Sequence, residues 1–380
     1  MPNIGHFFMP IKIKFFDEMQ FFTIKYVNLK KFTMFVSTQI NTKMKNLTLL
    51  TLFFLVASNL QAQDNIDELL AAGVEDAKLF TTDYIAPASE GLVYGINNGW
   101  FNSGKSLHRF GFEFSIIANA SFIKDNKKSF LMNIADYQNV RFQDGASSKN
   151  VATALGNNDP DITVIVTYDD PIFGDQEVEI QLPTGIGSEG INILPTAFLQ
   201  ASFVPFKGTQ LKGRYFPKVN TDDVKLGLFG LGLQQEFTQW LPAEKIWPID
   251  ISGLIAYTHL DGSYDFTDEG IVEGDNQQIQ TEVNSMLYQL IVSTKLKVIN
   301  FYAGLGYLSG KSTTDLLGTY RVSNGVLTSE DLVDPFSIEK KIKGTRATAG
   351  FKLQLGFFGI NGDYTLAEFD NASLGLNFSF

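Results

Sequence analysis

The chain ends on Ser373–Phe380, whose sequence is SLGLNFSF. In an extended strand its four large apolar side chains share one face and the small or polar ones share the other, because successive side chains point in opposite directions. Chain termini usually fray into water, so an aromatic strand that continues to Phe380 indicates a face that is buried along its whole length. Two structures fit this pattern: a strand of a membrane β-barrel, and an edge strand of a soluble sheet.

Longer versions of the same alternation recur along the chain. In 346–355, for example, apolar residues alternate with Arg346, Thr348 and Lys352. Other alternating segments are 110–123, 193–206, 208–218, 224–237, 249–258, 286–295, 299–307 and 358–366. Most reach the length of ~9–11 residues that a tilted membrane strand needs, whereas strands of soluble sandwiches usually have ~5–6. Strand length therefore favours the barrel.

The composition indicates an all-β protein and excludes several kinds of chemistry. The 380 residues include 34 Phe, 13 Tyr and 33 Gly, and aromatic girdles on alternating strands are typical of membrane barrels. A soluble sandwich rich in glycine and aromatic residues has the same composition. There is no Cys and there are only three His, which excludes disulfides, thiol catalysis and a His-rich metal site. The net charge of −11 argues against nucleic acid as a partner.

These segments predict an antiparallel transmembrane β-barrel of about twelve strands over 91–380, with ten and fourteen as alternatives. Such barrels have short periplasmic turns and longer external loops, and the final strand enters the periplasm. Counting back from Phe380 makes the following turns periplasmic: 356, 297, 241–248, 207 and 124–127. The long external connections are then 310–338, 262–277 and 143–190. The count requires 110–123 to run inward, 128–142 to be a barrel strand, and 92–100 to be the outgoing first strand.

Three segments precede the predicted barrel. Residues 1–43 have no usable period and are interpreted as an upstream extension or a mis-called start, with a long natural leader as the alternative. Residues 44–62 have the basic start, apolar stretch and small final residue of a secretory signal peptide, and they are too short for a membrane helix. Residues 63–90 contain a predicted amphipathic helix over 64–84, which either plugs the lumen or covers the surface. Pro87 is expected beyond the end of this helix.

The insertion 143–190 is long and acidic, and two strand-like runs, 162–168 and 177–182, predict a hairpin within it. Clustered carboxylates can bind a hard cation such as calcium. The spacing matches no EF-hand loop, so a solvated acidic loop is the preferred interpretation, and no metal or other cofactor is predicted.

The polar faces of the alternating segments carry charged residues, which in a membrane barrel would line the lumen. These lumen-facing candidates are Glu113, Asp250, Lys295, Arg346, Lys352 and Asp363. No catalytic constellation accompanies them, because the common serine-hydrolase, zinc and phosphate-binding motifs are missing from the sequence. His259, with Asp261 and Ser263 near an external strand end, is the nearest approach to one, and such groupings arise often by chance. The sequence therefore predicts a protein that is not an enzyme.

The terminal strand also resembles the β-signal by which bacterial outer-membrane barrels are recognised for assembly, with Gly375, Phe378 and Phe380 as its signal residues. The mature chain resembles uncharacterised outer-membrane barrels of Bacteroidota, a domain of unknown function. That resemblance rests on the leader ending at Gln63, the helix Asp64–Tyr84, the stretch Ala86–Gly91, Asn97–Trp100 and the terminal strand. A helix before a barrel is more distantly similar to the long-chain fatty-acid transporters, although Ala86–Ala88 only partly matches their Asn-Pro-Ala motif.

Export by a signal peptide and the β-signal together predict a location in the cell outer membrane. The expected partners are outer-membrane lipid and the barrel-assembly machinery, with a small or hydrophobic solute as a further candidate. The preferred functional hypothesis is a channel or transporter for such solutes, because ten to fourteen strands enclose an interior too wide for wall side chains to fill. The alternative is a non-transport surface barrel that acts as an adhesin or assembly partner through its external loops.

Overall fold

The computed structural model describes residues 70, 73–170, 174–220, 224–240, 248–265, 274–323 and 329–380. The chain divides into two compact units between Leu50 and Thr51. The first unit, which contains the predicted upstream extension and much of the predicted signal peptide, lies outside the described residues, so the account below concerns the second. Within the described ranges, no helix is both long enough and apolar enough to cross a membrane.

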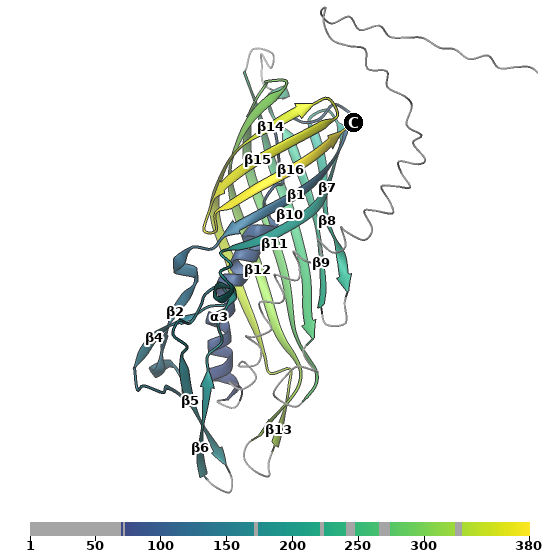
Figure 1. Cartoon of the computed structure of the whole chain (residues 1–380). Coiled ribbons are helices and arrows are strands. Elements are labelled where there is room, and N and C mark those ends of the chain that lie inside the picture. Colours follow the sequence, from purple (N-terminus) through teal and green to yellow (C-terminus); the bar gives the residue numbers. More distant parts are fainter. Residues whose placement is uncertain are drawn as a thin grey trace, which may run out of the picture. The chain divides into compact units, whose positions relative to one another are not determined.

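Ten strands form a closed antiparallel barrel (Figure 1). They are β1 (Phe112–Phe122), β7 (Ile193–Phe206), β8 (Thr209–Asn220), β9 (Val224–Glu236), β10 (Ile249–Asp265), β11 (Gly274–Thr294), β12 (Ile299–Ser323), β14 (Phe336–Leu355), β15 (Phe358–Leu366) and β16 (Asn371–Ser379). The β1–β16 pairing, with Ile116 opposite Leu376, joins the two ends of this series. Closure leaves no unpaired sheet edge within the ring. The predicted all-β barrel is confirmed, with a strand number at the lower end of the expected range.

We call the barrel end that carries Phe380 the C-terminal end and the opposite one the loop end. The short connections near 207, 297 and 356 lie at the C-terminal end, as predicted, and the predicted turn 241–248 lies almost entirely outside the described residues. The predicted external connections 262–277 and 310–338 lie at the loop end, but paired strands continue into both: β10 and β11 into the first, and β12 and β14 into the second. A further strand, β13 (Ser329–Val333), pairs with the part of β12 that extends past the loop end. The short turn η5 (Thr238–Trp240) follows β9.

Two of the twelve predicted strands are not in the barrel. Residues 92–96 are the last turn of the long helix α3 (Val74–Ile96), and 97–100 continue into a loop. The glycines of this last part of the helix lie against the barrel wall, because a Cβ at Gly91 would lie 2.5 Å from the Leu194 side chain and one at Gly95 3.0 Å from Ser121. Glycine four residues apart lets the helix pack closely against the barrel wall.

The second misassigned strand, 128–142, belongs to an insertion rather than to the wall. Because β1 pairs antiparallel with both β7 and β16, it runs from the C-terminal end to the loop end, opposite to the predicted direction. The turn at 124–127 therefore lies at the loop end and not at the predicted periplasmic end. Both misassigned segments precede β7 along the chain. The predicted directions of the later strands were counted back from Phe380, so they do not depend on these two segments.

The helix also differs from its prediction over 64–84. It begins at Val74, and Pro87 lies inside it rather than beyond its end; of the predicted helical residues, 64–69, 71 and 72 fall outside the described ones. The predicted apolar stripe is buried where it is described, with Ala77 and Phe80 fully covered. Proline usually breaks a helix because it lacks a donor and crowds the preceding turn. Here burial of Tyr84 before it and Val93 after it offsets that cost.

Residues 123–192 form what we call the insertion module. It contains η2 (Asp125–Lys127), β2 (Ser129–Asn133), η3 (Ile134–Asp136), β3 (Val140–Phe142), β4 (Ser148–Ala152), β5 (Thr163–Asp170), β6 (Gly174–Gln181) and η4 (Ile186–Glu189). Strand β2 pairs with β4, and β5 pairs with both β3 and β6. The predicted hairpin is confirmed, with Val166 opposite Val178.

The insertion module has an apolar core of its own at the loop end. Val164, Val166 and Ile180 are fully buried in it together with Phe80 of α3. Tyr320 of β12 and Ile338 of β14 close the other side, together with Leu316 and Phe336. Strands β12 and β14, of 25 and 20 residues, extend well past the nine-residue β15 and β16. The helix is thus held between the module and the extended barrel wall.

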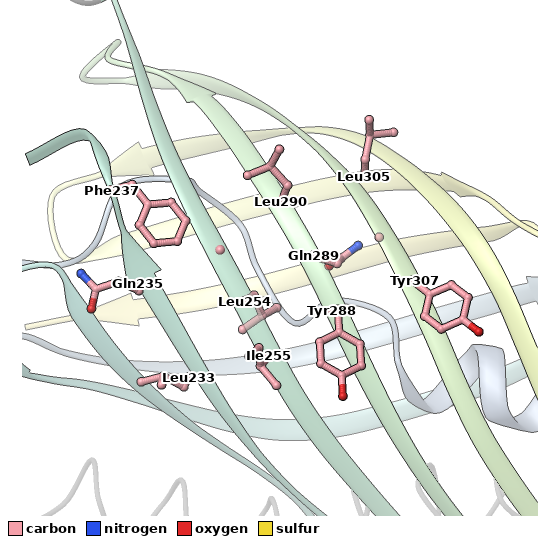
Figure 2. Close-up of a pocket in the computed structure, with 12 residues that line it drawn as sticks. Leu233, Gln235, Phe237, Leu254, Ile255, Tyr288, Gln289, Leu290, Leu305 and Tyr307 are labelled. Atoms are coloured by element: carbon pink, nitrogen blue, oxygen red, sulfur yellow. The ribbon is translucent and has the colours of Figure 1, made fainter. Parts of the chain in front are cut away.

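The outward face of the barrel is apolar. Figure 2 shows part of it, a shallow depression at Gly253 that is bordered by Leu233, Ile255, Leu290 and Leu305. Aromatic side chains mark the loop-end border of this surface, with Tyr288 directly opposite Tyr307 and Tyr215 opposite Phe229. Others mark the C-terminal border: Phe112, Phe203, Phe206, Trp240, Phe357 and Phe380.

Candidate functional site

The barrel interior is occupied by the chain itself. After α3 the chain continues through residues 97–107, which we call the interior segment, and reaches β1 at the C-terminal end. Trp100 and Phe101 of this segment are 1% and 5% exposed. The Trp100 ring lies against β9, where a Cβ at Gly232 would be 3.0 Å from it. The Arg214 guanidinium of β8 lies over the same ring at 4.1 Å.

Hydrogen bonds fasten the beginning of the interior segment to several strands. Asn97 donates from Nδ2 to Ser285 Oγ of β11 (2.8 Å) and accepts from Thr258 Oγ1 of β10 (3.2 Å). Arg214 Nη1 donates to the carbonyl of Ile96 at 2.7 Å. Arg346 of β14 donates to the Asn97 carbonyl at 3.1 Å and also to the Asn98 side chain. Two buried arginines therefore hold the junction between helix and segment.

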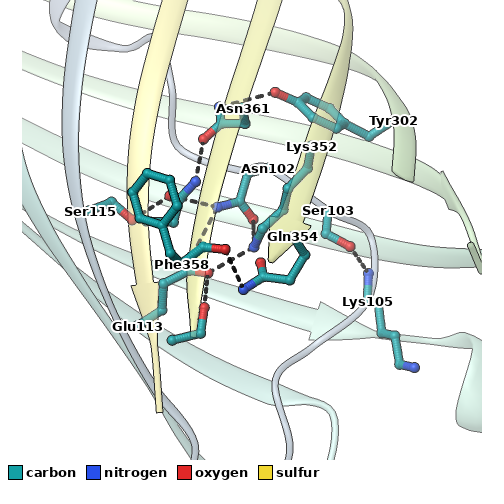
Figure 3. A network of polar contacts seen from close by, with 12 residues as sticks. Asn102, Ser103, Lys105, Glu113, Ser115, Tyr302, Lys352, Gln354, Phe358 and Asn361 are labelled. Carbon is teal, nitrogen blue, oxygen red and sulfur yellow. Dashed lines mark hydrogen bonds and ion pairs between the residues drawn. The ribbon is translucent and has the colours of Figure 1, made fainter. Parts of the chain in front are cut away.

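A second set of polar contacts fastens the middle of the segment (Figure 3). Asn102 donates to Glu113 of β1 (2.9 Å) and to Asn377 of β16 (3.1 Å), which places it beside the barrel seam. Lys352 of β14 donates to Glu113 at 2.8 Å and to Asn102 at 3.3 Å. Ser379 Oγ also donates to Glu113, at 2.9 Å. The Glu113 carboxylate is thus shared between the wall and the interior segment.

The last part of the segment contacts the opposite side of the barrel. The Gly104 amide donates to Ser293 Oγ of β11 at 3.0 Å. Ser106 donates to Glu236 Oε2 of β9 from both its amide (2.9 Å) and its hydroxyl (2.7 Å). The segment is therefore hydrogen-bonded to β1, β9, β10, β11, β14 and β16, and its Trp100 ring stacks against Arg214 of β8.

The six charged candidates for the lumen fall into three groups. Glu113 and Lys352 form the ion pair described above. Asp250 and Lys295 lie 3.5 Å apart near the C-terminal end. Asp363 accepts a hydrogen bond from Tyr302 at 2.9 Å, and Arg346 bonds the interior segment. All but Lys295 are at most 9% exposed, so these charges are engaged within the protein rather than free to line an open channel.

Sequence reasoning missed the interior segment and two of the wall residues that meet it, Lys212 and Arg214. The alternating pattern assigned 92–100 to a strand because its few large residues can be read with a period of two. The run Asn97-Asn98-Gly99 was the available signal against that assignment, since Asn and Gly clusters mark turns. Gly99 has a φ of +67°, a left-handed conformation that glycine adopts without steric cost.

The residues of the predicted assembly signal lie at the seam and at the C-terminal border. Phe112 and Phe380 exchange two backbone hydrogen bonds, of 3.0 and 2.7 Å. The Phe378 ring packs on Phe358 with 5.6 Å between centroids. A Cβ at Gly375 would lie 2.3 Å from the Asn361 amide oxygen. Recognition of this strand by an assembly machinery stays a prediction.

His259 does not assemble a catalytic triad with Asp261 and Ser263. The three lie on the outward face of β10, with 3.8 Å between His259 Nε2 and the Asp261 carboxylate. Asn284 binds the other ring nitrogen at 2.9 Å. Among the described residues, no group of three or more His, Asp or Glu side chains could hold a metal ion. His259, Asp261 and Ser263 come directly after Tyr257 on this face of β10, at the point where the apolar outward surface ends.

A cluster of ion pairs joins three parts of the loop end. Lys127 of the insertion module lies 2.7 Å from Glu90 of α3 and 2.8 Å from Glu368, in the connection between β15 and β16. Hydrogen bonding to Lys127 and its positive charge lower the pKa of Glu368. Burial lowers the pKa of Lys127, but the hydrogen bonds to Glu368 and Glu90 outweigh it, so this pKa is raised. Lys127 and Glu368 are both charged at neutral pH, and the cluster fixes the module to the barrel.

Comparison with known proteins places the chain in a family. Residues 44–380 match a family of unknown function, DUF6588. The chain belongs to this family. The expected membership in an uncharacterised family is thereby confirmed, whereas an origin in Bacteroidota and the similarity to long-chain fatty-acid transporters stay predictions. Comparison with curated proteins found no match.

Comparison with solved structures finds bacterial proteins of low similarity to this chain. The attachment invasion locus protein Ail of Yersinia pestis is 10% identical, over 72% of this chain and 99% of its own, with a TM-score of 0.20. The translocator domain of the autotransporter NalP from Neisseria meningitidis is 9% identical, over 72% and 90%, with a TM-score of 0.26. The transport unit of the autotransporter AIDA-I from Escherichia coli is 9% identical, over 79% and 99%, with a TM-score of 0.28. Values this low carry no argument about function.

Proposed function

We propose that this chain is an outer-membrane barrel that holds a folded binding module at the cell surface, and that it is closed to solutes in its resting state. The observation that carries the proposal is the interior segment, which crosses the barrel interior and is hydrogen-bonded to β1, β10, β11, β14 and β16. A pore would need a continuous aqueous path, and burial of Trp100 and Phe101 leaves none at their level.

The outward surface supports a membrane location. Membrane barrels carry an apolar band ~25 Å tall between two aromatic girdles, and this barrel has both an apolar outer face and aromatic residues at its two borders. Beyond Tyr257 and Tyr288 the outward face turns polar, with His259, Asp261 and Glu282. A soluble sandwich would turn its polar side chains outward over the whole length of its strands.

The insertion module supports a role at the loop end. It has a buried core shared with α3 and with the extended strands β12 and β14, so it is a defined structure rather than the solvated acidic loop that the sequence predicts. Its outer strand β6 exposes Glu177 and Glu179. A fixed acidic surface is suited to binding a basic partner. This supports the hypothesis that the protein acts as an adhesin or assembly partner through its external loops.

Transport is the second candidate, and it is favoured by the polar character of the contacts that hold the segment. Hydrogen-bonded groups such as Asn97, Asn102 and Ser106 can exchange their partners for water, whereas an apolar plug would be held by the hydrophobic effect. In the transport hypothesis the interior segment leaves the barrel, and the charged residues of the wall then line the path of the solute.

Planar-bilayer conductance distinguishes the two candidates. The purified full chain should show no steady conductance, and a variant that lacks residues 74–107 should conduct, because its interior is emptied. A variant that lacks 129–182 but keeps the interior segment serves as the matched control and should stay silent. Heat-dependent mobility in a detergent gel checks that each variant forms a barrel. Steady conductance by the full chain would reject the closed resting state.

A further inference from the structure

A positively charged cavity lies at the C-terminal end of the barrel, between the interior segment and the barrel wall. Its volume is about 390 Å³. Five lysines line it: Lys105, Lys212, Lys295, Lys297 and Lys352. Among the described residues, Glu113 is the only acidic one in the lining. The concentration of cations is notable in a chain with a net charge of −11, because a cavity in an acidic protein would be expected to share its sign.

The acidic groups nearby are already engaged with part of this charge. Glu113 accepts hydrogen bonds from Lys352, Asn102 and Ser379. Asp250, which lies next to the cavity, is 3.5 Å from Lys295. These pairs account for two of the five lysines, and Lys105, Lys212 and Lys297 remain as the cations available to a ligand.

Lys212 is the lysine whose surroundings most clearly favour a bound anion. Its side chain comes from β8 and is 4% exposed. It makes no hydrogen bond or ion pair with any residue that the structure describes, although the Glu113 carboxylate is near enough to attract its charge. Two residues earlier on the same face, Gln210 is equally buried and lines the same cavity. A buried ammonium group without a partner is costly. A bound anion at this position would provide that partner.

We propose that this cavity binds a small, multiply charged anion, with Lys212 at its base and Lys105 and Lys297 at its mouth. Lysine binds phosphate and carboxylate groups as a point charge rather than through a fixed fork, so the site selects charge more strongly than shape. The site lies at the opposite end of the barrel from the insertion module, and it does not depend on the function proposed above.

Isothermal titration calorimetry of the detergent-solubilised full chain tests the site, with pyrophosphate and citrate as probes in separate titrations. We expect saturable binding of at least one of the two anions at a single site, weakened by added salt because screening shortens the reach of the charges. Lys212→Gln should weaken binding about tenfold or more, since it removes a charged, buried donor. Lys297→Gln, at the exposed mouth, should weaken it only a few-fold.

Lys341→Gln is the matched control, because Lys341 is an exposed lysine on β14 that pairs with Glu339 away from the cavity. It should leave the affinity unchanged. Gel mobility before and after heating checks the folding of each variant. If Lys212→Gln does not fold, the double variant Lys105→Gln/Lys297→Gln decides. The proposal fails if neither probe binds saturably, or if the cavity variants bind as tightly as the control.

Discussion

At the scale of single residues, the Glu113–Lys352 pair shows what the interior demands of charged side chains. Glu113 is 2% exposed, and a charge at that depth is tolerated only with close partners. Alternation in the sequence predicted that both residues leave the apolar face. It could not predict that they meet, because they lie 239 positions apart and their contact depends on closure of the barrel.

Glu113→Gln should destabilise the barrel by about 3–5 kcal/mol, because it leaves the Lys352 ammonium buried without its counter-charge. The double variant Glu113→Gln/Lys352→Met should recover much of that loss, since no unpaired charge remains. The temperature at which the folded gel band converts to the unfolded one measures both effects. Equal losses in the single and double variants would contradict the importance of the pair.

At the scale of elements, the strands of the barrel wall were predictable, whereas the segments inside the barrel and beyond its loop end were not. In the barrel part of β14 and β15 one face points outward and is apolar, and the other points into the barrel and is polar. Apolar and polar residues therefore alternate along the sequence with a period of two. Helix α3 contacts the barrel wall at one end and the insertion module at the other. Its apolar pattern therefore packs against two different surfaces, and its last turn, with Gly95, was mistaken for part of the strand 92–100.

The pKa shifts in the Lys127 cluster determine how the attachment of the insertion module to the barrel should respond to pH. The folded pKa of Glu368 is lowered from 4.5, so its contribution is complete at neutral pH and is lost as the pH falls through that lowered value. The folded pKa of Lys127 is raised from 10.5, so its contribution is lost only in strong alkali. Cleavage of the module by an acid-active protease should therefore become faster below pH 4.5.

Lys127→Met removes the cation from this cluster and provides the comparison. At neutral pH the variant should be less stable by about 0.5–1 kcal/mol, the usual range for partly exposed pairs. The part of the acid response that Glu368 contributes should disappear. An unchanged pH profile in the variant would show that other carboxylates control the attachment.

At the scale of the whole molecule, the fold class and the placement of the long connections could be read from the sequence, whereas the filled interior could not. Strand count and turn length depend on local patterns. Occupancy of the lumen depends on contacts such as Asn97 with Ser285 and Asn102 with Asn377, which no local pattern encodes. The channel hypothesis followed from the width of the barrel, and the chain itself supplies what fills that width.

The orientation of the proposed surface barrel can be measured by cysteine labelling, because the chain has no Cys. Glu179→Cys, in the insertion module, should react with a membrane-impermeant maleimide on intact cells. Lys105→Cys, at the exposed mouth of the C-terminal end, should react only after the cells are opened. Both side chains are exposed, so accessibility and not burial decides the result. The reverse pattern would place the module in the periplasm.

The seam between β1 and β16 has a consequence for biogenesis. Strand β16 follows every other barrel strand along the chain, and β1 comes directly after the interior segment. The ring is therefore completed only when its earliest strand meets its latest one, and the interior segment emerges at both mouths, as α3 at one and as the lead-in to β1 at the other. Threading such a segment into a finished ring would require pulling a folded helix through it. We therefore expect the segment to be in place before β16 joins β1 and closes the wall around it.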